Sequence, residues 1–445
     1  MSHVAASHLE RREFLRRCAV AAASTAVVPA VASAAEPRKR TRSPNEKLNL
    51  GVIGVAARGG ANLGGVLSEN IVALCDIDAS RLGAAGEKLP KAEKYVDYRK
   101  LLDRKDLDAV VVSTPDHSHA IPVVWALNRG LDVYCEKPLA HSVFEVRTMR
   151  DLAAKKQAVT QMGTQIHAGD NYRRVVELVQ AGAIGPIERV YIWHNNQVRP
   201  GKRPTTETIP PPGIDYDLWV GPAPYRPFSE AHFHFNWRYW WDFGNGAYGD
   251  FGCHFGDLPF WALHLRYPTT IAATGRKTSS GDNDVPDEMQ IDWHFPARKV
   301  QGVAGELPPV HFTWYHGNES RPAWAEEYKT KASVLFEGTK GKILADYGSR
   351  KVYMGDGSSV VTPEPTIPNS IGHHAEWIAA VKSRGPTTCN FDYSGALTES
   401  VLLGNVAYRA GQKLEWDAAN LKATNCPAAD EFLRREYRKG WTLDG

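Results

Sequence analysis

Asp250 and His254 form the pair of side chains in this sequence best suited to moving a proton. They stand four residues apart in the stretch GDFGCHFGD, so in a helix they would share one face. A histidine can accept a proton near neutral pH, and a carboxylate one turn away can orient the ring or a substrate. Oxidation of a secondary alcohol needs this chemistry, because removing a hydride leaves a hydroxyl proton that a base must take.

Polar side chains also follow two short apolar runs. The segment S-T-P-D-H-S-H, residues 113–119, closes the run 109–114, and E-K-P, residues 136–138, closes the run 132–135. Ligands of open α/β sheets bind beyond the carboxyl ends of the strands, so these side chains should converge on one site. The side chains expected there are Thr114, Pro115, His117, His119, Glu136 and Lys137. Two simpler interpretations remain open: a solvated Lys137, and a histidine that caps the following helix.

A glycine turn joins the first apolar run to the first helical pattern. Residues 48–60 read LNLGVIGVAARGG, in which Gly54, Ala56 and Gly59 follow the pattern G-x-G-x-x-G with alanine in the second place. Gly54 permits the tight turn, and Gly59 permits close packing of helix on strand. The small Ala56 lets a diphosphate approach the free N–H groups at the start of the helix. The turn therefore predicts a dinucleotide site.

The carboxylate that follows the next strand indicates which dinucleotide. Asp76 stands 22 residues after Gly54, close to the spacing of an acid that hydrogen-bonds the ribose 2′-OH of NAD. A carboxylate there would repel a 2′-phosphate, so NAD is favoured over NADP. Arg58 and Arg81 stand nearby in the sequence and leave NADP open as an alternative.

Two kinds of pattern divide the chain after residue 46. From 47 to 165, short apolar runs alternate with helical patterns, which predicts a Rossmann domain with a doubly wound parallel sheet. From 166 to 445, the runs predict a C-terminal α/β domain with a large open, mostly antiparallel sheet, covered on one face by helices. One of these helices is expected to begin at Asp250. The Pro-rich stretch 199–228 reads as a long surface excursion of the kind that forms lids or subunit contacts.

Length and composition exclude several classes of protein. A chain of 445 residues favours two domains, since a domain usually has about 100–200 residues. A hydrophobic content of 43% and a charged content of 23% exclude a disordered, fibrous or multi-spanning membrane protein. The net charge of +3 gives no general reason to bind nucleic acid.

The N-terminus reads as an export signal. Residues 10–16 contain paired arginines followed by Phe-Leu, an Ala-rich stretch comes next, and Ala32-Ser33-Ala34 fits a cleavage site. This predicts a twin-arginine signal peptide over 1–34, a linker over 35–46 and a periplasmic location without stable membrane insertion. Six cysteines are present, and Cys18 lies in the signal, so five remain after cleavage, an odd number without C-x-x-C pairing. Folding in the reducing cytoplasm before export would explain such free thiols.

Four motifs together resemble the glucose–fructose oxidoreductase, inositol dehydrogenase and rhizopine-catabolism family, Gfo/Idh/MocA. They are the glycine turn, T-P-D-H-S-H, E-K-P and the stretch 249–257, and they stand at the spacing of that family. The resemblance covers essentially all of residues 47–440. It extends to exported members with N-W-R-x-W-W and L-L-G-N-x-A segments, here 236–241 and 402–407.

The resemblance implies roles for individual residues. His254 would be the acid/base, Asp250 would bind or orient the substrate, and Lys137 would polarise the reacting oxygen. The residues expected to bind the cofactor are Gly54, Ala56, Arg58, Gly59, Asp76, Thr114, Pro115, His117, His119, Glu136 and Gln165. The residues expected to bind substrate are His167, Arg173, Asn236, Trp237, Arg238, Trp240 and Asp257, of which Asp257 would act from behind the site.

The implied function is an NAD(P)-dependent oxidoreductase that acts on a secondary hydroxyl of a sugar or cyclic polyol. An exported enzyme has no evident pool of free nicotinamide, so the cofactor should stay bound and be recycled within the site. An alternative is a glycoside hydrolase or lyase that works through a transient keto-sugar without net redox change. A second alternative is a non-catalytic sugar-binding protein. The family also implies a homodimer or homotetramer built on the open sheet.

Two further interpretations of the central motif stay open. Asp250 could serve only as the N-cap of its helix. Alternatively, Asp250, His254 and Asp257 could bind a metal ion, although no further cluster of ligands is evident from the spacing and no metal is expected.

Overall fold

The computed structural model describes residues 41–195, 201–203, 206 and 208–444. The expected signal peptide, 1–34, and the start of the expected linker lie outside the described residues. The end of the linker is attached to the body of the protein, because Arg42 N donates to Lys382 O at 2.7 Å and the Arg42 side chain pairs with Asp108.

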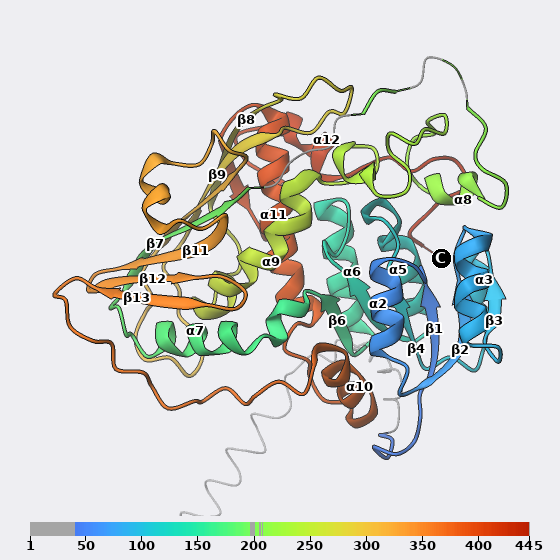
Figure 1. The fold of residues 1–445 in the computed structure, drawn as a ribbon, viewed down its shortest axis with the longest axis horizontal. Coiled ribbons are helices and arrows are strands. Elements are labelled where there is room, and N and C mark those ends of the chain that lie inside the picture. Colours follow the sequence, from blue (N-terminus) through green and yellow to red (C-terminus); the bar gives the residue numbers. More distant parts are fainter. Residues whose placement is uncertain (1–40, 196–200, 204–205, 207, 445) are drawn as a thin grey trace, which may run out of the picture. The chain divides into compact units, whose positions relative to one another are not determined.

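A parallel six-stranded sheet forms the N-terminal domain, in the order β3-β2-β1-β4-β5-β6 (Figure 1). Its strands are β1 (Asn49–Ile53), β2 (Asn70–Cys75), β3 (Glu93–Tyr95), β4 (Ala109–Val112), β5 (Asp132–Glu136) and β6 (Thr160–Gly163). The connecting helices are α2 (Arg58–Gly65), α3 (Ala79–Lys88), α4 (Tyr98–Leu102), α5 (Ala120–Asn128) and α6 (Val143–Lys155). Every residue of β4 is buried, as expected for a central strand covered on both faces. This is the predicted Rossmann arrangement.

A nine-stranded sheet forms the second domain, in the order β13-β12-β11-β7-β10-β9-β8-β14-β15. Its strands are β7 (Ile187–His194), β8 (Thr270–Arg276), β9 (Glu288–Phe295), β10 (Val310–His316), β11 (Ala332–Gly338), β12 (Gly341–Ala345), β13 (Arg350–Met354), β14 (Leu414–Asp417) and β15 (Lys422–Ala423). Strands β7 and β10 pair in parallel, and the other neighbours pair antiparallel. The predicted α/β fold class, with a mostly antiparallel second sheet, is confirmed.

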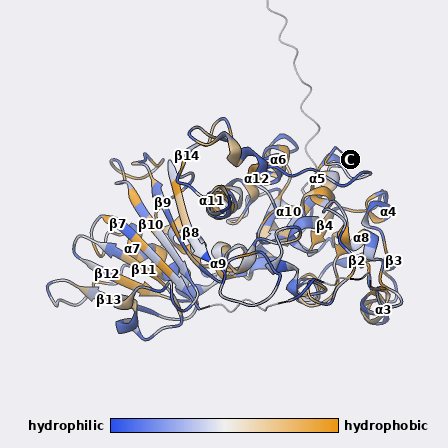
Figure 2. Ribbon diagram, turned by 90° about the horizontal axis from the view of Figure 1, so that it is seen from above, coloured by the Kyte–Doolittle hydropathy of each residue, from blue (hydrophilic) through white to orange (hydrophobic). Residues whose placement is uncertain are grey.

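Two long helices of the second domain, α9 (Gly246–Ala262) and α11 (Phe391–Ala410), lie between the two sheets. The other helices of this part of the chain are α7 (Asp170–Gln180), α8 (Tyr216–Val220), α10 (His373–Ser383) and α12 (Asp430–Leu433). Helices α9 and α11 cover one face of the large sheet and separate it from the Rossmann domain (Figure 2). Within the described residues, no helix combines the length and the apolar character needed to cross a bilayer.

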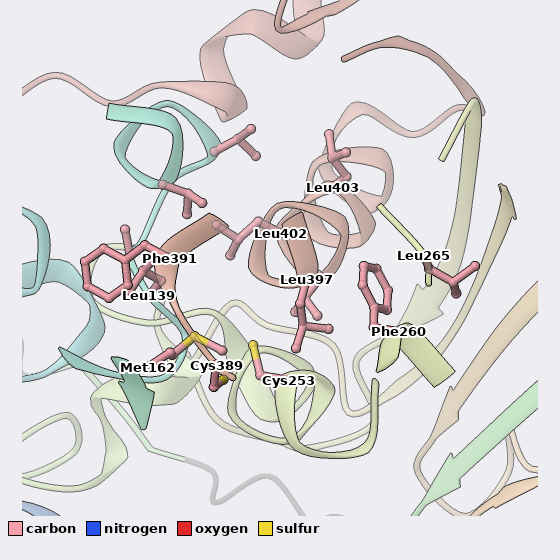
Figure 3. Packing of buried hydrophobic residues seen from close by; sticks show 14 of the residues in the cluster. Leu139, Met162, Cys253, Phe260, Leu265, Cys389, Phe391, Leu397, Leu402 and Leu403 are labelled. Carbon is pink, nitrogen blue, oxygen red and sulfur yellow. The ribbon is translucent and has the colours of Figure 1, made fainter. Parts of the chain in front are cut away.

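One hydrophobic core runs from the Rossmann domain into the second domain (Figure 3). Met162 at the end of β6 lies close to Cys253 of α9 and Leu397 of α11, and all three side chains are buried. Helix α9 approaches α11 closely because Gly252 and Gly256 lack side chains where the helices meet. A Cβ at Gly252 would lie 3.0 Å from Val401, and one at Gly256 would lie 3.2 Å from Leu397. This packing fixes α9, which carries the central motif, against the Rossmann sheet.

The start of α9 differs from the sequence-based expectation. The helix begins at Gly246, one turn earlier than the predicted Asp250, so Asp250 lies inside it and the N-cap interpretation of Asp250 is wrong. Glycines at 246 and 249 argue against a helix on propensity alone. Burial of nearly the whole helix against neighbouring elements overrides that preference.

Buried neutral histidines make the stability of the fold dependent on pH. Burial lowers the pKa of His117 and His373 to about 3, and that of His119 and His316 to about 4. As the pH falls from about 6.5 towards 4, these histidines become protonated in the unfolded chain but stay neutral in the folded protein. The free energy of unfolding should then drop by up to about 1.4 kcal/mol per pH unit for each histidine. Asp116 has the opposite effect, because burial raises its pKa to about 7. As the pH falls, the folded protein binds this proton before the unfolded chain does, which favours the folded state.

Urea unfolding at about pH 7.5 and about pH 5 measures this prediction. We expect a clearly lower midpoint at the lower pH. The difference should persist in high salt, because it arises from burial and not from exposed charges. Equal midpoints at the two pH values would contradict it.

Candidate active site

An ion pair between Lys137 and Asp250 lies at the centre of the site. Lys137 follows β5 and begins a cis peptide bond to Pro138, and its Nζ donates to the Asp250 carbonyl oxygen at 2.9 Å. The same ammonium group pairs with the Asp250 carboxylate. Only 9% of the Lys137 side chain and 18% of the Asp250 side chain are exposed. Lys137 is therefore held by the helix of the other domain and is not a freely solvated surface lysine.

A second cation stabilises the charge of Asp250. Arg238 Nε lies 3.3 Å from Asp250 Oδ1. Burial by itself would raise the pKa of Asp250, but Lys137 and Arg238 outweigh it and hold this pKa well below its usual range. Asp250 is thus ionised at neutral pH, flanked by a lysine from one domain and an arginine from the other.

His254 lies one turn further along α9, beside the ion pair. Its Nδ1 is buried and has no hydrogen-bond partner. Burial and the Lys137 cation lower its pKa to about 3, so the ring is neutral at pH 7. The Tyr347 ring lies 6.2 Å from the His254 ring, centroid to centroid, in an edge-on arrangement. The spacing predicted one shared helix face, and the structure places Lys137, Asp250 and His254 together as expected.

The two histidines of the 113–119 segment face backbone carbonyl groups. The ring nitrogens of His117 lie 2.8 Å from Trp219 O and 3.2 Å from Phe243 O, and its one N–H can donate to either carbonyl. His119 likewise lies 2.9 Å from Pro138 O and 2.7 Å from Thr114 O. Both rings are buried, and their nitrogens face backbone carbonyls and not an open site. These contacts hold the strand ends in place, and a contact of either histidine with the cofactor stays a prediction.

Thr114 and Pro115 stay at the carboxyl edge of the sheet, half-buried. Thr114 Oγ1 donates to Ser118 O at 3.0 Å, and Pro115 precedes the short helix Asp116–Ser118. Asp116, which the sequence analysis did not single out, is buried beside the ion pair and accepts from Asn245 Nδ2 at 3.2 Å. A strand-end aspartate within T-P-D-H-S-H was the available signal for it.

Asp257 and His167 form a buried pair behind the site. His167 Nδ1 lies 2.8 Å from Asp257 Oδ1, which also accepts from Tyr393 OH at 2.7 Å. The His167 ring stacks on Trp261 at 4.1 Å. Asp257 is completely buried, so it does not touch substrate directly and instead orients His167, whose Nε2 is buried without a partner.

Arg173 also lies away from an open surface. It is buried on α7, its Nη1 donates to Pro368 O at 2.7 Å, and its guanidinium lies over the Trp261 ring. These contacts give Arg173 a packing role beside His167, and the structure does not place it with Asp250 and His254.

The aromatic segment before α9 divides into core and surface. Trp240 is 0% exposed and its Nε1 donates to Ala231 O at 3.2 Å, and Trp237 is only 6% exposed. Neither tryptophan can offer a broad ring face to a sugar, which corrects the expectation for both. Phe235 is 49% exposed, and Asn236 Oδ1 is buried without a hydrogen-bond partner. Of the rings named here, Phe235 is the one exposed to solvent. Tyr347, which is 40% exposed, is a second exposed ring, and the sequence analysis did not identify it.

The glycine turn has the shape that a dinucleotide needs. Gly54 has a φ of +84°, and a Cβ there would lie 2.6 Å from Ser113 O. A Cβ at Gly59 would lie 2.1 Å from Gly54 O. No side chain caps the start of α2, where Ala57 is the N-cap residue, so its first N–H groups remain available for phosphate oxygens. Ala56 is half-buried and Arg58 is exposed at this turn.

Two carboxylates flank this turn. Asp76 is half-buried, and its Oδ2 accepts from Val55 N at 3.0 Å, which fixes the carboxylate beside the turn. Glu136 is buried and accepts from Asn62 Nδ2 at 2.9 Å and from Gln165 Nε2 at 2.7 Å. Burial raises the pKa of Glu136. The clamped turn, the uncapped helix start and Asp76 together fit a bound NAD.

A possible metal site lies elsewhere than the sequence suggested. Among the described residues, the side chains close enough to one another to share a metal ion are His167, Asp257 and Cys389, all buried. This group includes neither Asp250 nor His254, so the predicted alternative ligand set is not brought together. His167 and Asp257 are already hydrogen-bonded to each other.

Removing the Asp76 carboxylate should weaken NAD binding selectively. We expect Asp76→Ala to raise the Kd for NAD by about 10–100-fold, as for loss of a charged hydrogen bond, and to leave NADP binding unchanged or improved. Isothermal titration of cofactor-free protein measures both constants. Asp103→Ala, an exposed carboxylate of the same domain, is the matched control. Equal losses for both dinucleotides would contradict the ribose contact.

Two family models match adjoining parts of the chain. Residues 48–164 match the NAD-binding Rossmann fold of the GFO_IDH_MocA oxidoreductase family, and residues 173–271 match the C-terminal alpha/beta domain of that family. The N-terminal domain is thus an NAD-binding domain, in agreement with the predicted cofactor.

Curated relatives match over part of their length. An inositol 2-dehydrogenase of Salmonella paratyphi B is 30% identical over 155 residues, which cover 34% of this chain and 46% of the relative. A glycosyl hydrolase family 109 protein of Shewanella pealeana is 30% identical over 213 residues, covering 41% of this chain and 46% of the relative. The chain thus spans about half the length of these relatives.

A solved structure shares the fold over most of the chain. It is the WlbA dehydrogenase from Bordetella pertussis in complex with NADH and UDP-GlcNAcA, with a TM-score of 0.58 and 16% identity. The match covers 84% of this chain and 99% of the dehydrogenase.

Proposed function

Because residues 48–164 and 173–271 belong to the Gfo/Idh/MocA oxidoreductase family, we propose that this protein oxidises a secondary hydroxyl of a sugar or cyclic polyol with tightly bound NAD. The observation that carries the proposal is the convergence of Lys137, Asp250 and His254. These side chains meet beyond the carboxyl end of β5, at the edge of an NAD-binding sheet. Ligands of such sheets bind at this edge.

The turn at Gly54 and Gly59 and the carboxylate of Asp76 would hold NAD. When bound, NAD supplies the acceptor for a hydride. The remaining task of the protein is to take the hydroxyl proton and to stabilise charge on the substrate oxygen.

His254 takes the proton in this proposal. Its ring is neutral at pH 7, so one of the two ring nitrogens carries a lone pair, and no hydrogen bond occupies Nδ1. The O–H bond of the substrate breaks and its proton moves to the ring. The electron pair left on oxygen forms the carbonyl as the C–H bond of the same carbon breaks, and the hydride leaves to the acceptor that bound NAD would supply. A protonated His254 would be stabilised by the Asp250 carboxylate one turn away on α9.

Lys137 and Asp250 position and polarise the reacting oxygen. Of the three N–H groups of the Lys137 ammonium, one donates to Asp250 O and one to the Asp250 carboxylate, so one remains for a substrate oxygen. Asp250 holds that ammonium in one place from across the domain boundary. The pair is thus preorganised before substrate arrives, which is the arrangement that lowers a barrier most effectively.

Substrate recognition is assigned to the surroundings of this pair. The exposed rings of Phe235 and Tyr347 offer apolar faces to the C–H face of a sugar, and Asn236 Oδ1 offers an unused acceptor for a hydroxyl. His167 Nε2 is a further polar atom without a partner.

A redox-neutral glycosidase is the second candidate. The relative in Shewanella pealeana is described as a glycosyl hydrolase family 109 protein and is similar to this chain over 213 residues. The same site could oxidise a ring hydroxyl, promote elimination of the aglycone, add water and restore the hydroxyl. Both candidates use His254 and Lys137 in the same way, and they differ in whether a glycosidic bond is broken.

Export and assembly complete the proposal. A twin-arginine signal over 1–34 would deliver the folded, loaded enzyme to the periplasm. The open sheet offers a face for a homodimer or homotetramer, where Trp324 is 40% exposed beside Tyr191. Unpaired or open sheets favour association. Light scattering at micromolar concentration tests the assembly, and a monomer would contradict it.

Product analysis tests the activity and separates the two candidates. Protein purified without added cofactor is incubated with a library of sugars, polyols and glycosides, and the products are identified by mass spectrometry. A keto-sugar formed together with a reduced second sugar supports the oxidoreductase. A free aglycone without accumulating NADH supports the glycosidase. If the purified protein releases no dinucleotide on denaturation and binds none on addition, both candidates fail.

A further inference from the structure

A segment of the second domain, residues 208–238, lies against the turn that follows β2. Ala79 N donates to Gly213 O at 2.9 Å, and Asp215 N donates to Ile77 O at 2.9 Å. Asp78 and Ile214 pair between these two hydrogen bonds as an antiparallel bridge. This turn comes directly after Asp76, the carboxylate assigned to the cofactor ribose. The chain therefore closes one side of the adenosine end of the cofactor site with backbone of another domain.

A side chain makes a second contact on the same turn. His234 Nε2 lies 3.2 Å from Asp78 Oδ2. Burial and the neighbouring Arg81 lower the pKa of His234 to about 4, so at pH 7 a neutral ring donates to the carboxylate. Asp78 is itself fixed, because its Oδ1 accepts from Ser80 N at 2.9 Å and thereby caps α3.

The same segment reaches the catalytic end of the site four residues later. Arg238 contacts Asp250, and its guanidinium lies over the rings of Phe235 and Trp237 at 4.6 and 4.2 Å. Residues 234–238 thus touch both the turn beside the ribose carboxylate and the carboxylate beside the reacting atoms. These two places are the two ends of the cofactor site described above.

A cluster of buried rings holds the segment to the residues that follow it, with Ile77 from the turn after β2 packed against the cluster. Its members include Tyr216, Trp219 and Phe228 of the segment, and Trp240 and Phe243 beyond it. Trp219 O also receives the His117 ring from the Rossmann domain at 2.8 Å. Opening the segment therefore requires several buried contacts to separate together.

We propose that residues 208–238 form a strap that lies across the cofactor site and prevents NAD from leaving between turnovers, with the His234–Asp78 hydrogen bond as its closing contact. This inference rests on the proposed function only in that NAD binds at the Gly54–Gly59 turn. It assigns a cause to cofactor retention that lies in the fold and does not depend on export. NAD is then a resident group of the enzyme and exchanges only when the strap opens.

Exchange of labelled NAD tests the strap without relying on turnover. Protein loaded with isotopically labelled NAD is mixed with excess unlabelled NAD, and the label retained is followed by rapid gel filtration. Loss of a hydrogen bond to a charged group should speed release in His234→Ala on the order of 10-fold or more. His294→Ala, an exposed histidine on β9, is the matched control and should release label at the wild-type rate.

A reversible cross-link provides the opposite test. A Cβ at Gly213 would lie 3.4 Å from the Cβ of Ala79, close to the separation of about 3.5–4.5 Å that a disulfide requires. In Ala79→Cys/Gly213→Cys, oxidation should slow NAD exchange at least 10-fold relative to the same protein after reduction. Because both states carry the same substitutions, strain at Gly213, where φ is +85°, is common to both. Peptide mass spectrometry verifies the link between 79 and 213.

The outcomes separate this inference from the proposed function. Faster exchange in His234→Ala, together with slower exchange in the oxidised pair, establishes the strap. Equal exchange in the oxidised and reduced pair, or wild-type exchange in His234→Ala, overturns it even if sugar oxidation is intact. If NAD does not bind at all, the proposed function fails as well.

Discussion

Replacing His254 by alanine should lower turnover of the sugar substrate by a factor of about 10²–10⁴ while NAD remains bound. The reason is that His254 lies one turn from Asp250 on α9 and has an unpartnered ring nitrogen, and α9 contains no other histidine. Its side chain makes none of the contacts assigned to NAD at the Gly54–Gly59 turn. Steady-state rates and the NAD content of the purified variant measure the two parts of this prediction.

A histidine outside the site provides the control. His264 follows α9 directly and contacts Gln180 on an exposed surface, so His264→Ala should retain wild-type turnover. Full activity in His254→Ala would refute the assigned role. Recovery of that variant only on addition of zinc would point instead to a metal-dependent site.

Arg147→Ala should destabilise the protein by about 3–5 kcal/mol, the largest effect we expect on stability. Arg147 of α6 donates through Nη2 to Glu399 Oε1 of α11 at 2.8 Å and also pairs with it through Nε. Glu399 is completely buried and accepts in addition from Trp416 Nε1 at 3.1 Å. Removing the arginine leaves a buried carboxyl without its cation, exactly where the Rossmann domain meets the second domain. Urea unfolding at neutral pH measures the loss.

The neighbouring pair on α6 supplies the control. Asp151 is 63% exposed and pairs with Arg150, so Asp151→Ala should change the free energy of unfolding by less than about 0.5 kcal/mol. Similar losses in Arg147→Ala and Asp151→Ala would contradict the account of the domain contact.

The fold class could be predicted because it depends on periodicity. Fully buried strands such as β4 leave continuous apolar runs, and the alternation with helices up to residue 165 restricts the arrangement to a doubly wound sheet. The weak elements escaped prediction. Strand β3 has three residues, none of them buried, and β15 has two, so neither leaves a pattern to detect.

The central motif could be predicted for the same kind of reason. A spacing of four residues places Asp250 and His254 on one face of any helix, and a strand end places Lys137 at the binding edge of the sheet. Neither placement depends on contacts between distant segments of the chain. The structure adds what spacing could not supply, namely that Lys137 and Asp250 form an ion pair across the domain boundary.

The remaining site residues depend on tertiary contacts. His117, His119 and Trp240 are suited to ligand binding by residue type, but their nitrogens lie within hydrogen-bond distance of the backbone carbonyls of Trp219, Pro138 and Ala231. Tyr347 and His234 carry no motif and reach the site only through the folding of the second domain. Sequence indicates where a strand ends, whereas the partners of a polar atom are set by packing.

The most direct measurement of the central claim is a single turnover with bound NAD. Protein carrying its own NAD is mixed by stopped flow with a sugar or polyol identified by product analysis, and nicotinamide reduction is followed by absorbance. We expect nicotinamide reduction to slow when the reacting carbon carries deuterium and to be lost in His254→Ala. A substrate that is turned over without transient reduction and without an isotope effect would contradict the account, as would wild-type reduction in His254→Ala.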